Sequence, residues 1–97
     1  MKPELLAQSP TDWVLQGRVE FADAPELAAA FEPQAEQSYS LDLQAASGGS
    51  PLLLVLLAWY RQAQAVGADL QLLKASQALQ RLVALSDLEA LLPLQPG

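Results

Sequence analysis

The chain has 97 residues and a mass of 10.4 kDa, a size typical of one domain, so we expect a single domain over residues 1–97. Its net charge of −6, with only five Lys and Arg residues spread along the chain, disfavours nucleic acid and anionic lipid headgroups as partners. The sequence contains no Cys and no His, which excludes disulfides, thiolate nucleophiles, imidazole bases and the usual zinc sites, so we expect neither catalytic activity nor a bound metal or cofactor.

The start of the chain predicts a hairpin followed by a helix. The two hairpin strands fall near residues 3–8 and 12–20, on either side of a Ser-Pro-Thr-Asp turn cluster. Asp23 and Glu26 have the spacing of a capping box, with a Pro between them where the first turn tolerates it. These residues predict a helix near 24–32.

The middle of the chain predicts a strand, the longest helix and a further strand. Residues 38–43 alternate polar and apolar side chains, as a half-buried strand does. Ser50 is expected as the N-cap of a helix over 50–66, because Pro51 follows it at the favoured first helical position. A short strand is expected over 69–73.

The end of the chain predicts one more helix, near 76–85, with Ser76 as its N-cap. Ser86 and Glu89 have the spacing of a second capping box. Strands and helices alternate after the initial hairpin, which indicates an α/β fold. We expect a four-stranded mixed sheet with the helices packed mainly on one face.

The sequence indicates neither an export signal nor a membrane span. Its first residues lack an apolar stretch followed by a small-residue cleavage site. The longest apolar run, residues 52–60, is about half the roughly 20 residues that cross a bilayer. We therefore expect a soluble, cytoplasmic protein that does not insert into a membrane.

The Gly-rich segment 47–50 has two interpretations. The free N–H groups and the dipole at a helix start favour anions, so the segment has the geometry of an anion site. It is a poor nucleotide site, because no Lys follows the glycines and Pro51 lacks an N–H. The alternative is a tight connection that ends in a capping Ser. The carboxylates of the chain offer no better site, because helix capping accounts for the close pairs.

The helix that begins at Pro51 is apolar on more than its buried side. Its period places Leu53, Leu56, Tyr60 and Ala63 on one side and Leu54, Ala58, Arg61 and Ala65 on the other. A helix that covers an open sheet usually has a polar outer side, although single exposed leucines are ordinary. An apolar outer stripe beside a Gly-rich helix start is also what a protein-docking surface presents.

Six short segments resemble, in their order and spacing, a STAS domain, the family named after sulfate transporters and anti-sigma factor antagonists. The segments are residues 15–19, 41–43, 49–57, 67–72, 85–88 and 91–93. The family pattern is a strand, a loop with Asp-Ser/Thr-x-Gly, and an apolar helix beginning Leu-x-x-Leu-Leu. The resemblance implies the STAS fold, with helices mainly on one face of a mixed sheet.

The loop of this chain departs from the family pattern. Ser50 matches the family's Ser/Thr, Gly49 stands where the Asp would be, and Leu52 replaces the Gly. In anti-sigma factor antagonists the partner kinase phosphorylates that Ser, which makes Ser50 a candidate for phosphorylation. The missing Asp argues against such a switch.

Within the family the chain most resembles the MlaB branch, whose members are cytoplasmic subunits of a phospholipid ABC transporter. The resemblance implies an ATPase subunit as protein partner, with association to the inner membrane only through the transporter complex. We expect the partner to contact Ser50 and Leu54, with Ala58 and Arg61 extending the contact. The alternative hypothesis is an anti-sigma factor antagonist in a phosphorylation-controlled partner switch.

Overall fold

In the computed structural model, which describes residues 3–87, 92 and 94–96, the chain begins with the predicted hairpin. Its strands are β1 (Glu4–Ala7) and β2 (Asp12–Arg18), which pair antiparallel with Leu5 opposite Leu15. The amide of Gln8 donates to the Asp12 carbonyl at 2.8 Å and closes the turn. The hairpin places β1 at one edge of the sheet.

The sheet is mixed, as predicted, but it has six strands rather than four. The further strands are β3 (Ser38–Asp42), β4 (Ala46–Ser47), β5 (Asp69–Ala75) and β6 (Leu94–Pro96). The order is β1-β2-β3-β5-β6, and β4 pairs with the end of β2 beyond β3; all pairs except β1–β2 are parallel. β4 and β6 were not predicted, because strands of two and three residues are too short to show an alternation.

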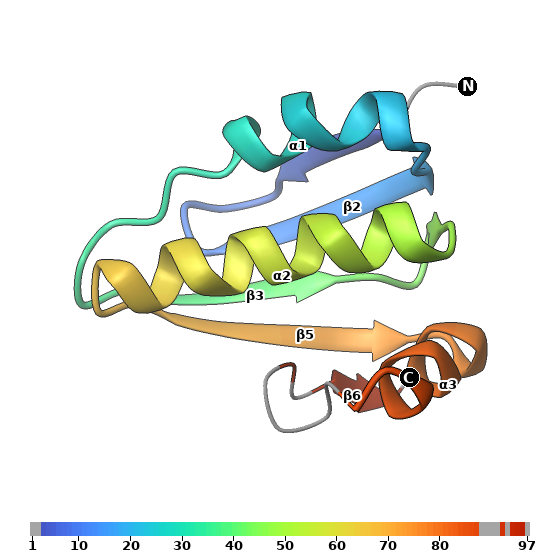
Figure 1. The fold of residues 1–97 in the computed structure, drawn as a ribbon. Helices are drawn as coiled ribbons and strands as arrows, with labels where there is room; N and C mark the ends of the chain where they lie inside the picture. The colour runs from blue at the N-terminus through green and yellow to red at the C-terminus, as the bar shows by residue number, and fades with distance from the viewer. Residues whose placement is uncertain (1–2, 88–91, 93, 97) are drawn as a thin grey trace.

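In the described part of the chain, three α-helices connect the strands. They are α1 (Ala24–Ala30), α2 (Ser50–Ala65) and α3 (Gln77–Leu85). Figure 1 shows α1 and α2 side by side on one face of the sheet, with α3 near α2 and the carboxyl end of β5. The arrangement confirms the α/β class with helices on one face, as parallel strands joined by crossover helices require.

The first helix begins at the predicted residue, but the segment that leads into it differs from the prediction. β2 stops at Arg18, and residues Phe21–Asp23 form a 3-10 turn (η1) that leads into α1. The predicted capping box of Asp23 with Glu26 is wrong, because the Asp23 carboxylate instead accepts a hydrogen bond from the Glu20 amide at 3.1 Å. The pairing therefore lies three residues earlier and stabilises the 3-10 turn.

The other predicted boundaries mostly agree with the structure. α1 ends at Ala30, two residues before the predicted end, and the next residue is extended. α3 begins after Ser76, whose hydroxyl accepts a hydrogen bond from the Leu79 amide, as predicted. Glu89, the second member of the predicted capping box with Ser86, lies outside the described residues.

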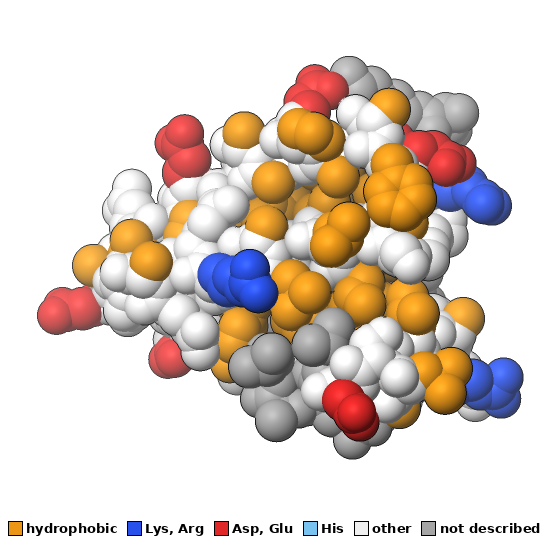
Figure 2. Space-filling model, in the orientation of Figure 1, with side chains coloured by type: hydrophobic (Ala, Val, Ile, Leu, Met, Phe, Trp, Pro, Cys, Tyr) orange, Lys and Arg blue, Asp and Glu red, His pale blue; other side chains and the backbone are white. Residues whose placement is uncertain are grey.

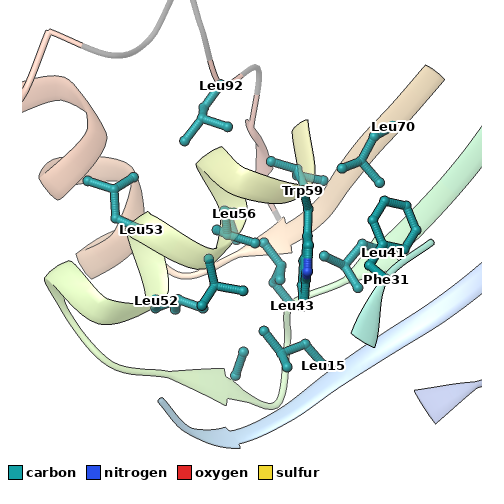
Figure 3. Packing of buried hydrophobic residues seen from close by; sticks show 14 of the residues in the cluster. Leu15, Phe31, Leu41, Leu43, Leu52, Leu53, Leu56, Trp59, Leu70 and Leu92 are labelled. Atoms are coloured by element: carbon teal, nitrogen blue, oxygen red, sulfur yellow. The ribbon is translucent and has the colours of Figure 1, made fainter. Parts of the chain in front are cut away.

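The core lies between the sheet and α2. The helix buries seven residues, which are Pro51, Leu52, Leu53, Val55, Leu56, Trp59 and Ala63. Figure 3 shows Leu56 and Trp59 pointing from α2 toward Leu41 and Leu43 of the sheet side. The Trp59 ring also meets Phe31 edge-on, with ring centroids 5.9 Å apart. Such aromatic contacts add to the hydrophobic gain of burial.

Trp59 also contributes a polar contact to the core. Its side chain is 1% exposed, and its Nε1 donates to the Leu27 carbonyl in the last turn of α1 at 2.9 Å. Gln62, one turn away on the helix surface, donates its amide to the Ala28 carbonyl at 2.9 Å. Two side chains of α2 thus donate to carbonyls at the end of α1, where the helix itself provides no further N–H donors.

We predict that Trp59→Phe destabilises the fold. The substitution removes the donor to the Leu27 carbonyl and leaves space beside the ring, so the free energy of unfolding should fall by about 1–3 kcal/mol. Urea unfolding of the purified chain measures this difference.

Trp13→Phe is the matched control, since Trp13 Nε1 is buried without a hydrogen-bond partner among the described residues. Removing an unpaired buried donor costs little or is favourable. The control loses the same ring volume but no hydrogen bond, so we expect it to lower the free energy of unfolding by less than Trp59→Phe does. Equal losses in the two variants would contradict the role given to the Trp59 hydrogen bond.

Candidate docking site

The start of α2 differs in one residue from the prediction. The N-cap is Gly49, not Ser50, and Ser50 is the first residue with helical geometry. The first helical hydrogen bond runs from the Leu53 amide to the Gly49 carbonyl at 3.2 Å. The Ser50 hydroxyl is exposed and makes no hydrogen bond with another described residue, so it is not used to cap the helix.

Close packing accounts for one glycine, Gly48, of the Gly-rich segment before the helix. Its φ angle is +129°, and a Cβ at this position would lie 2.8 Å from the Val19 carbonyl oxygen. The Val19 amide donates to the Ser47 carbonyl at 2.9 Å, so this segment is held against the end of β2. Gly48 is therefore required by close packing of backbone on backbone. This favours the tight-connection interpretation of the segment.

The predicted outer stripe of α2 faces solvent. Ser50 and Arg61 are exposed, Leu54 is 51% exposed, and Ala58 is half-buried between them. Their spacing of four, four and three residues places them along one side of the helix. The structure thus brings the four expected partner-binding residues onto one surface. Tyr60, which the helical period places on the buried side, is only half-buried.

The sequence analysis missed two exposed apolar side chains on other elements. Phe21, in the 3-10 turn before α1, is 64% exposed, and Leu85, at the end of α3, is 86% exposed. Both residues belong to apolar patterns that predict burial. Only their position at the end of an element indicates that they are exposed. Figure 2 shows hydrophobic side chains gathered over α2 and the neighbouring helices, with acidic side chains mainly around the margin.

The described residues show no constellation for metal-dependent chemistry or membrane insertion. Within residues 3–87, 92 and 94–96, no three His, Cys, Asp or Glu side chains are placed to hold a metal ion. In the same part of the chain, no helix has the length and apolar character of a membrane span. The outer side of α2, with Leu54 51% exposed, is the candidate docking surface.

Comparison with known families identifies the domain. A family model described as "Mlab, STAS domain" matches residues 7–93, which is nearly the whole chain. The chain belongs to this STAS domain family. Ser50 and the outer side of α2 belong to the apolar helix of the family pattern described above. No match was found among curated proteins.

Solved structures share the STAS fold at low sequence identity. The chain is similar to the structure of the anti-sigma factor antagonist SpoIIAA in its unphosphorylated form, with a TM-score of 0.67 and 15% identity over 98% of this chain and 88% of that one. It is also similar to an anti-sigma factor antagonist from Mycobacterium paratuberculosis, with a TM-score of 0.62 and 18% identity over 98% of this chain and 85% of that one. These likenesses support the fold.

We predict that the two helix-start serines differ in their effect on stability. Ser76→Ala removes a side-chain cap and should lower the free energy of unfolding by about 1 kcal/mol. Ser50→Ala removes a hydroxyl without a cap and should change the same quantity by less than about 0.5 kcal/mol. Urea unfolding of both variants checks this. A loss at Ser50 as large as at Ser76 would mean that the Ser50 hydroxyl caps α2 in solution.

Proposed function

We propose that this STAS domain is a non-catalytic subunit of an ABC-type phospholipid transporter that maintains outer-membrane lipid asymmetry. In this role it binds the ATPase subunit in the cytoplasm and supports its assembly and activity. It reaches the inner membrane only through the complex. The observation that carries the proposal is the exposed apolar side of α2, which begins at Ser50, in a domain of the MlaB type.

The chemistry of the α2 surface supports a lasting protein contact. Leu54 is 51% exposed although the inward side of the same helix already buries seven residues. Only another molecule could bury it further, and an apolar side chain at the centre of a contact is a common source of affinity. Gly49 replaces the Asp of phosphorylated family members, which favours a permanent subunit over a reversible switch.

The alternative function is an anti-sigma factor antagonist, and one observation favours it. The Ser50 hydroxyl, at the position of the family's phosphorylated Ser, is exposed and makes no hydrogen bond with another described residue. Incubation with the anti-sigma factor kinase of the same organism and ATP distinguishes the two functions. Addition of one phosphate, lost in Ser50→Ala, would favour the partner switch and count against the transporter role.

We predict that Leu54→Asp weakens binding to the ATPase subunit at least about thirtyfold. A carboxylate placed in the desolvated centre of a contact costs about 2 kcal/mol or more of binding free energy. Titration calorimetry with the purified ATPase subunit of the transporter measures the affinity. The melting temperature of the variant should stay near that of the unchanged chain, because Leu54 is on the surface.

Leu6→Asp is the matched control for this prediction. Leu6 is 41% exposed on β1, at the edge of the sheet, and lies away from the outer side of α2. The control introduces the same charge and should leave the affinity unchanged. Equal affinity of Leu54→Asp and the unchanged chain would remove this surface from the interface. A collapse of the melting temperature of Leu54→Asp would show that Leu54 belongs to the core.

A further inference from the structure

Charge is unevenly distributed over the helical face. The chain carries a net charge of −6, yet α2 and α3 contain no acidic residue, and each contains one arginine, Arg61 and Arg81. Both arginines are exposed. The described acidic residues that follow the helices in sequence are Asp69, after α2, and Asp87, after α3. The two helices themselves therefore contribute two positive and no negative charges to an acidic domain.

These two arginines also differ from the other described cations. Arg18 pairs with Glu20 at 2.9 Å, and Lys74 pairs with Asp42 at 3.5 Å. Among the described residues, neither Arg61 nor Arg81 has a carboxylate within 4.0 Å or a side-chain hydrogen bond. Both guanidinium groups are thus available to a partner, and each can hold a carboxylate with two parallel hydrogen bonds.

The outer face of α2 alone is smaller than a typical protein contact, so a contact of ordinary size would extend beyond α2. A helix of 16 residues is about 24 Å long, and an outer face about 10 Å wide covers on the order of 240 Å². A stable protein contact buries about 800 Å² on each partner. α3 packs against α2, and Figure 3 shows Leu53 between the two helices. At the end of α3, the 86% exposed Leu85 adds apolar surface.

We infer that α2 and α3 together dock an acidic protein surface, in which carboxylates pair with Arg61 and Arg81 between apolar contacts to Leu54 and Leu85. The identity of the partner rests on the proposed function. The inference adds the chemical character of the surface by which that partner binds. Charge complementarity carries it, because two unpaired arginines attract an anionic surface, whereas the same cationic surface on a second copy would be repelled. Two arginines are fewer than the four to eight basic residues that hold a protein on anionic lipid.

The test measures the affinity of Arg61→Glu, Arg81→Glu and the double variant for the purified ATPase subunit. Each single variant should bind at least about tenfold more weakly, and added salt should weaken the unchanged chain more than the double variant. Lys74→Glu is the control, since it makes the same change in charge. Lys74 pairs with Asp42, which alternates with the buried Leu41 and Leu43 and so lies on the sheet face away from the helices. The control should bind within about twofold of the unchanged chain, and all variants should keep its melting temperature.

The same titrations are made with the anti-sigma factor of the organism and with vesicles that contain phosphatidylglycerol. Arginine-dependent binding to the anti-sigma factor alone would support the inference and overturn the transporter role. Binding to the ATPase subunit that is unchanged in both arginine variants would overturn the inference and leave the transporter role intact. Arginine-dependent binding to vesicles, or binding to neither protein, would overturn the inference.

Discussion

The arrangement of the helical layer depends on two hydrogen bonds between α1 and α2. The Trp59 indole N–H and the Gln62 amide of α2 donate to the Leu27 and Ala28 carbonyls at the end of α1. Each bond requires a fixed distance and angle, so together they set the position of one helix along the other. The Trp59 ring adds an edge contact to Phe31, the residue that follows α1. A polar and an apolar contact of the same side chain thus join the two helices.

The orientation of α2 determines what the domain shows to solvent. Once Leu56 and Trp59 point toward the sheet, the helical period places Leu54 and Arg61 on the opposite side. The helix exposes an apolar stripe because its sequence places apolar residues on the outer side as well as on the buried side. The surface that we assign to a partner is therefore a direct result of core packing. A change in the core that rotated α2 would also move this surface.

Most of the fold could be predicted from the sequence where an element has a strong local boundary. Ser76 before α3 and Pro51 at the start of α2 are such boundaries, and both helices lie within one residue of the prediction. β4 and β6 could not be predicted, since their pairing with β2 and β5 is tertiary. The exposure of Leu54 follows from the helical period, whereas that of Leu85 depends on how α3 packs. Local pattern contains no information about that packing.

The contact of Gly48 with the end of β2 has a consequence for the lifetime of a complex. The backbone of this residue lies against the Val19 carbonyl, and the Val19 amide donates to the Ser47 carbonyl, so the loop before α2 is held against the end of β2. A partner that docks there loses little conformational entropy from this side, so more of the contact energy appears as affinity. Among related complexes such gains lie mainly in slower dissociation. A loop held in this way therefore suits the lasting subunit contact that we propose.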